Sequence, residues 1–159
     1  GDIKIFKRIG DKTVTVYSVD TNIKHDIRTG SSKYVINNYE ILGSSLERIL
    51  ADKCLATLSY KRFRRIKDFY DIFIILNSDL NFDVSEVLEL MVLSTSKEEV
   101  KELLEVLPFS DEIMKQSEHA WKKFSLTRFS GAEIDKPNFR NMYDVVTTLY
   151  DSLLIKIGD

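Results

Sequence analysis

The chain has 159 residues, of which 43% are apolar and 30% are charged, and this balance excludes an intrinsically disordered protein. The net charge of −2 excludes a protein that is basic overall, so any attraction to nucleic acid must be local. One cysteine cannot form an internal disulfide, and with only two histidines it cannot build a zinc site. No apolar run reaches the roughly 18 residues that a transmembrane helix needs, so we expect a cytoplasmic protein without membrane contact.

Three β-strands are expected at the start of the chain. Residues 3–9 and 13–19 alternate apolar and polar positions around a Gly-Asp pair, which is the pattern of a β-hairpin. Residues 21–28 alternate in the same way and predict a third strand. Residues 29–43 are rich in Ser, Asn and Gly, so we expect them to link the strands to the helices that follow.

The first helix is expected over residues 44–58, with Gly43-Ser44 as the turn and N-cap before it. At about 100° per residue, Lys53 falls near 340° when Leu46 is set at 0°, inside the arc of apolar side chains. A charge within an apolar face is costly unless it has a partner. Either Lys53 extends its ammonium to the edge of the helix, or the ammonium reaches an anion such as a phosphate in a cleft.

The second helix is expected over residues 61–77 and carries charges beside a wide apolar face. Asp68 and Asp71 are one turn apart, so they could hold a divalent cation, accept a proton or pair with nearby cations. Five cations lie within seven residues at the expected start of this helix: Lys61, Arg62, Arg64, Arg65 and Lys67. The helix dipole disfavours cations there, so either an anionic ligand lies nearby or the helix start is solvated, with Arg64 and Asp68 as an i,i+4 pair.

The rest of the chain is expected to be helical. Further helices are expected over residues 83–94, 96–107, 109–124 and 138–156, with a loop over residues 125–137. Asp83 and Ser96 are the expected N-caps of two of them, and Glu99 completes a capping box with Ser96. Trp121 beside two lysines could stack a base, but this pattern is more typical of a helix edge, and we assign it no role.

Two motifs in the first two helices resemble a known family. The pattern S-x-E-E-I-x-A-E-K-x-x-A appears, with Arg48 in place of one Glu, as Ser45, Glu47, Ile49, Ala51, Asp52, Lys53 and Ala56. The pattern R-D-x-Y-D-[IL] appears, with a lysine in place of its Arg, as Lys67, Asp68, Tyr70, Asp71 and Ile72. In this order and spacing, the motifs resemble the C-terminal half of the AbiEii/AbiGii-type nucleotidyltransferases, the toxins of type IV toxin–antitoxin and abortive-infection systems. Outside these motifs the resemblance is weak.

The resemblance implies an activity and a set of site residues. The parent protein would use Mg2+ to transfer a nucleotide from a nucleoside triphosphate to an acceptor, either tRNA at its 3′ end or a protein, and would have an antitoxin partner. Lys53 resembles the lysine that contacts the triphosphate. Asp68 resembles the acid of the last motif, a base or orienter near the acceptor or nucleotide, and Asp71 would support it in the nucleotide site. The basic residues that would meet phosphate oxygens are Arg64, Arg65 and Lys67.

The chain departs from the family in its metal-binding motif. In the family, a Gly-Ser after a strand is followed about ten residues later by D-x-[DE], whose acids hold the metal ions. No such pair follows Gly43-Ser44, so we expect a C-terminal piece of a longer protein that is inactive in transfer by itself. A third metal-site carboxylate in the family comes from a strand before the lysine helix. Asp26 is the best candidate for this catalytic and metal-binding acid, with Asp20 as an alternative, although Asp26 could also be an ordinary exposed residue.

The expected fold class is α+β, with a short antiparallel sheet, made of the N-terminal hairpin and a third strand, followed by an α-helical bundle. It would be the C-terminal part of a nucleotidyltransferase-like fold, with residues 1–43 as the β remnant and residues 44–159 as the helical domain. The competing hypothesis is a non-catalytic helical module that binds an antitoxin protein or RNA, with Lys53 and Asp68 merely paired. A closed salt bridge without a cleft would favour the module, and an open concave surface beside the strands would favour the enzyme.

Overall fold

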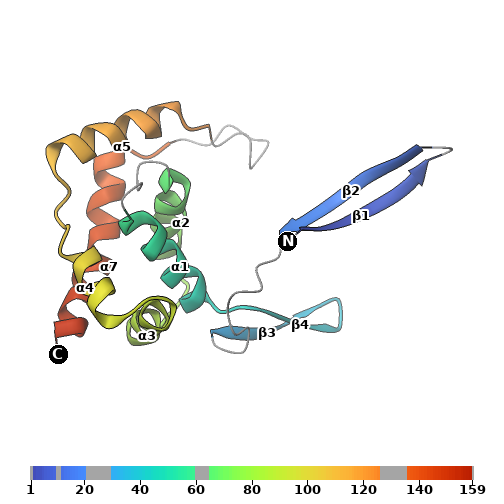
Figure 1. Ribbon diagram of the computed structural model, residues 1–159, viewed down its shortest axis with the longest axis horizontal. Helices are drawn as coiled ribbons and strands as arrows, with labels where there is room; N and C mark the ends of the chain where they lie inside the picture. Colours follow the sequence, from blue (N-terminus) through green and yellow to red (C-terminus); the bar gives the residue numbers. More distant parts are fainter. Residues whose placement is uncertain (1, 10–11, 21–29, 60–64, 126–135, 159) are drawn as a thin grey trace.

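Six helices make up most of the computed structural model, which describes residues 2–9, 12–20, 30–59, 65–125 and 136–158 (Figure 1). In chain order they are α1 Leu46–Leu58, α2 Ile66–Leu76, α3 Val84–Ser94, α4 Lys97–Leu104, α5 Asp111–Lys123 and α7 Phe139–Gly158. α7 contacts α2, α3, α4 and α5, and α1 contacts α2, α3 and α4. None of these described helices has the length and apolarity needed to cross a membrane.

Two antiparallel hairpins precede the helices. They pair β1 Asp2–Ile9 with β2 Lys12–Asp20, and β3 Ser31–Ile36 with β4 Tyr39–Ser44. In Figure 1 the β3–β4 hairpin extends away from the helical bundle. The α+β fold class and the hairpin over residues 3–9 and 13–19 are confirmed. The predicted third strand, residues 21–28, lies outside the described residues, and Asp26 lies outside them with it.

The prediction of a linker over residues 29–43 is wrong, because the segment contains β3 and most of β4. Asn37 and Asn38 occupy the two central positions of the turn, with φ angles of 49° and 68°. A type I′ hairpin turn needs positive φ at both positions, and asparagine adopts this conformation at lower cost than most residues. The Asn-Asn pair is therefore a turn signal between two strands, flanked by β-forming residues such as Val35 and Ile41.

The hydrophobic core forms where α7 packs against the other helices. The buried face of α7 consists of Phe139, Met142, Val146, Leu149, Tyr150, Leu153 and Ile157, at the i, i+3, i+4 spacing of an amphipathic helix. Thr57 of α1 and Tyr150 are both fully buried, and their hydroxyl oxygens lie 2.7 Å apart. This hydrogen bond satisfies polar groups that would otherwise be costly inside the core, and it joins α1 to α7.

Polar side chains begin the helices that follow the hairpins. Asp83 and Ser96 are N-caps as predicted, since their side chains accept hydrogen bonds from backbone N–H groups of α3 and α4. The N-cap of α1 is Ser45 rather than Ser44, because Ser44 is still paired in β4. The Oγ of Ser45 accepts a hydrogen bond from the backbone N–H of Arg48 at 3.1 Å.

The second helix begins with fewer described residues than the sequence analysis expected. α2 starts at Ile66, and residues 60–64 lie outside the described part of the chain. Arg65 therefore takes the N-cap position and Lys67 lies in the first turn. Its buried side chains are Ile66, Phe69 and Ile72, which leaves Asp68 and Asp71 on a partly exposed side.

Candidate functional site

Lys53 of α1 lies against two carboxylates of α2. Its Nζ is 2.6 Å from Oδ2 of Asp71 and 3.1 Å from Oδ1 of Asp68. The exposed fractions of these side chains are 21% for Lys53, 23% for Asp68 and 25% for Asp71. The contact between α1 and α2 thus brings together the charged residues that the two sequence motifs single out.

Lys53 lies at the edge of the buried face of α1 and not in its middle. The middle is formed by Leu50, Cys54 and Leu58, which are fully buried at i, i+4 and i+8, whereas Leu46 is only partly buried. On an ideal helix Lys53 is about 100° from Cys54. Its stem therefore flanks the core while its ammonium reaches α2. The structure shows the first explanation for this lysine, a charge at the helix edge.

Burial and ion pairing act on Lys53 in opposite directions. Burial lowers the pKa of Lys53, because it disfavours the charged form. Hydrogen bonds to Asp71 and Asp68, and the negative charges of both carboxylates, outweigh burial and raise the pKa above the ordinary value of 10.5. Lys53 is therefore a fixed positive charge at neutral pH, which suits anion binding and excludes a role as a general base.

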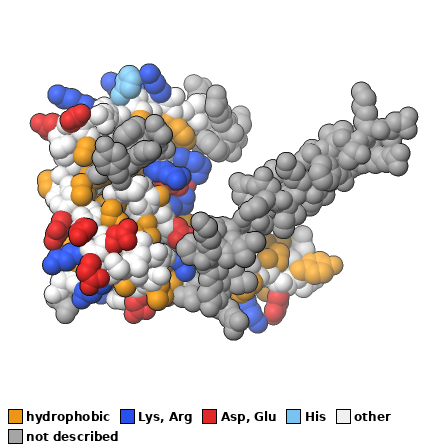
Figure 2. Space-filling view, in the orientation of Figure 1, with side chains coloured by type: hydrophobic (Ala, Val, Ile, Leu, Met, Phe, Trp, Pro, Cys, Tyr) orange, Lys and Arg blue, Asp and Glu red, His pale blue; other side chains and the backbone are white. Residues whose placement is uncertain are grey.

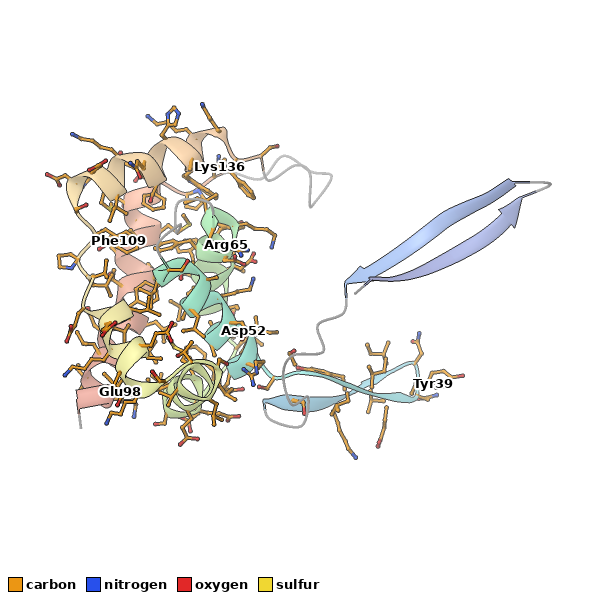
Figure 3. The ribbon with its side chains drawn as sticks, viewed as in Figure 1. Tyr39, Asp52, Arg65, Glu98, Phe109 and Lys136 are labelled. Carbon is orange, nitrogen blue, oxygen red and sulfur yellow. The ribbon has the colours of Figure 1, made fainter. Side chains whose placement is uncertain are left out.

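Two more cations pair with the same carboxylates. Lys67 Nζ lies 2.7 Å from Oδ2 of Asp71, the oxygen that also accepts from Lys53. A guanidinium nitrogen of Arg65 lies 3.9 Å from Oδ2 of Asp68. Figure 3 shows Arg65 beside the first turn of α2. We call these five residues the lysine–aspartate cluster.

The surface around this cluster carries both signs of charge. Figure 2 shows basic side chains close to acidic ones in the region of α2, next to residues that are not described. Arg64 is one of the undescribed residues, so the expected Arg64–Asp68 pair cannot be placed. In its stead, Arg65 pairs with Asp68 at i,i+3 and Lys67 pairs with Asp71 at i,i+4.

The cavities found among the described residues lie away from the cluster. One of about 460 Å³ lies beside Trp121 and Lys136, and one of about 440 Å³ lies beside Leu88 and Val92. Neither is lined by Lys53. The ion pairs of Lys53 are closed, and on this criterion the geometry favours the binding module. The case for the enzyme therefore depends on the composition of the cluster and on the family.

Trp121 is not available for base stacking. Its side chain is only 4% exposed, and its indole N–H donates a hydrogen bond to the Pro137 carbonyl at 2.8 Å. The ammonium of Lys136 lies 4.4 Å from the centre of the ring, and the ring of Tyr70 lies 5.3 Å from it. Trp121 is therefore part of the aromatic packing between α2 and α5.

The described residues do not fit a metal centre or a thiol nucleophile. No group of three or more His, Cys, Asp or Glu that could hold a metal occurs among them. Asp68 and Asp71 instead hold the ammonium of Lys53. Cys54 is fully buried, and burial raises its pKa to about 12, so it remains an unreactive neutral thiol.

Arg48 is a structural residue that the sequence analysis noted only as a departure from the family motif. It is 8% exposed, donates a hydrogen bond to Ser94 Oγ of α3 at 3.0 Å, and lies 3.6 Å from Asp52. A Cβ at Gly30 would come within 2.9 Å of the Cβ of Arg48, so the chain entering β3 passes directly over this side chain. Arg48 thus joins α1 to α3 at the base of the hairpin. The available signal was its position one turn before an acid, on a helix that is mostly buried.

Comparison with known families identifies the chain. Residues 10–145 match the family described as nucleotidyl transferase AbiEii toxin, type IV TA system. The chain belongs to the AbiEii family of nucleotidyltransferase toxins. No curated protein and no solved structure matches it. The AbiEii match covers most of the chain and includes the whole lysine–aspartate cluster, so the resemblance first seen in two motifs is confirmed.

Membership of the AbiEii family gives the chain a general function. The family consists of nucleotidyltransferase toxins of type IV toxin–antitoxin systems. Nucleotidyltransferases generally use a nucleoside triphosphate and Mg2+, and a toxin of this type is accompanied by an antitoxin. The roles of individual residues and the acceptor are not given by the family match.

Proposed function

We propose that the lysine–aspartate cluster binds the triphosphate of a nucleoside triphosphate during nucleotide transfer. The observation that carries the proposal is the ammonium of Lys53, held charged and oriented by Asp68 and Asp71. An ammonium group has three N–H donors, so two bonds to carboxylates leave one for a phosphate oxygen. With Arg65 and Lys67, the cluster has three cations and two carboxylates, and its net charge favours an anion.

The proposed roles follow the chemistry of transfer. The oxygen of an acceptor hydroxyl attacks the α-phosphorus, the bond from that phosphorus to the bridging oxygen breaks, and pyrophosphate leaves. Lys53, Arg64 and Arg65 contact phosphate oxygens, and Asp68 orients the hydroxyl or accepts its proton. No step is assigned to Mg2+, because the described residues do not fit a metal. Asp26 as a metal-site acid remains a proposal.

RNA is the proposed acceptor, above all the 3′ end of tRNA, with a protein as the alternative. The basic residues at the start of α2 support RNA, because they lie beside the proposed triphosphate site and can contact backbone phosphates. An antitoxin protein is the proposed partner, and the cytoplasm, where nucleoside triphosphates and tRNA occur, is the proposed location.

Nucleotide transfer by the complete gene product tests this function. The protein is incubated with Mg2+, each labelled nucleoside triphosphate and total cellular RNA, and we expect label on the RNA. Lys53→Ala and Asp68→Ala should each reduce transfer by about 100-fold or more, because they remove a phosphate contact and a positioned acid. Lys97→Ala removes an exposed lysine of α4 and should transfer like the wild type. Label on the protein would identify a protein acceptor, and the absence of label from folded protein would contradict the enzyme.

A second candidate function is a non-catalytic module that binds an antitoxin protein or RNA. The closed ion pairs of Lys53, and the position of the described cavities away from it, favour this alternative. In the module, Lys53→Ala would weaken the fold and change no transfer. The transfer assay with folded variants therefore separates the two functions.

A further inference from the structure

One oxygen atom in the cluster accepts hydrogen bonds from two lysines. Oδ2 of Asp71 lies 2.6 Å from Lys53 Nζ and 2.7 Å from Lys67 Nζ. The two ammonium groups are therefore no more than about 5 Å apart, since both are within hydrogen-bond distance of the same atom. Two positive charges this close repel each other unless a negative charge lies between them, so their arrangement depends on Asp71.

The two aspartates that orient Lys53 also oppose its proposed ligand. Their carboxylates bring two negative charges against one ammonium, so these three side chains together are net negative. A triphosphate that approaches Lys53 meets this charge at short range and in a partly desolvated place, where repulsion is stronger than in water. Lys53 with only its two acids would be well oriented but a weak ligand for an anion.

Lys67 removes this conflict at Asp71. It lies one turn before Asp71 on α2, at the i,i+4 spacing that lets the two side chains meet, and it is 45% exposed. We propose that Lys67 is a positioning residue of the triphosphate site, which neutralises Asp71 so that Asp71 orients Lys53 without repelling the phosphates. The inference rests on the proposed function. It differs from a direct phosphate contact because Lys67 acts through Asp71.

A double-mutant cycle on binding of inorganic tripolyphosphate to the 159-residue chain, measured by calorimetry, tests this role. Lys67→Gln should weaken binding about fivefold to tenfold in the wild-type background, and less than about twofold when Asp71 is already Asn. Lys67→Arg keeps the charge and should restore affinity. Lys97→Gln removes the same charge elsewhere and should change affinity less than about twofold. Asp71→Asn and Asp71→Ser are made in parallel, and urea unfolding of each variant identifies the folded background that closes the cycle.

The outcomes separate this inference from the function on which it rests. Equal losses from Lys67→Gln with and without the Asp71 carboxylate would overturn the positioning role and make Lys67 a direct ligand. In that case Lys53→Met would still weaken binding, and the proposed function would stand. No binding by the wild type, or unchanged binding by Lys53→Met, would overturn the proposed function and the positioning role together.

Discussion

Replacing both Asp68 and Asp71 with asparagine is expected to lower the free energy of unfolding by about 2–4 kcal/mol. The ammonium of Lys53 would keep its position at 21% exposure but would face two neutral amides. The cost of removing its water would remain while the compensating charges would be gone. Urea unfolding followed by circular dichroism measures the change. Lys33 and Glu40 form a matched control pair, 75% and 71% exposed, where Glu40→Gln should have almost no effect.

The pH dependence of stability should reverse its sign in that double variant. In the wild type the folded-state pKa of Lys53 is raised above 10.5, so its ion pairs stabilise fully below 10.5 and are lost as the pH rises through the folded-state pKa. In the variant only burial acts on Lys53 and lowers its pKa, so the destabilisation is relieved as the pH rises toward 10.5.

A third substitution provides the control for this reversal. Adding Lys53→Met to the Asp68→Asn, Asp71→Asn variant should recover most of the lost stability and remove both slopes, because no buried charge remains. A double variant as stable as the wild type would contradict the description of Lys53 as a charge held by two acids.

Ile72→Ala is expected to lower the free energy of unfolding by about 2–5 kcal/mol, because it leaves a cavity where a fully buried side chain packed. Ile72 lies on α2 next to Asp71 and holds this helix against the core. Ile74 on the same helix is 46% exposed, and Ile74→Ala should cost less than about 1 kcal/mol. Urea unfolding of both variants compares them. Equal effects would contradict the packing of α2 described here.

Much of the helical part could be predicted because its signals are local. Apolar spacing identified the face of α7, and Asp83 and Ser96 identified two helix starts. The β3–β4 hairpin was missed because a segment rich in Ser and Asn is typical of a linker. The decisive property, positive φ at both Asn37 and Asn38, depends on the strands that they join.

The candidate site was only partly predictable for a different reason. Lys53, Asp68 and Asp71 stand out in the sequence because their charges conflict with an apolar pattern. Their mutual contacts depend on how α1 and α2 pack, which local spacing does not determine. The same limit applies to the central position assigned to Lys53, because the partners of α1 shift its buried face toward Cys54.

The most direct test of the central claim is the affinity of the chain for each nucleoside triphosphate, measured by calorimetry in the wild type, Lys53→Met and Lys97→Met. The account predicts that the wild type and Lys97→Met bind alike and that folded Lys53→Met binds at least about tenfold more weakly, because a charged phosphate contact is lost. Equal affinity in all three proteins, or binding in none, would contradict it and leave Lys53 as a structural ion pair.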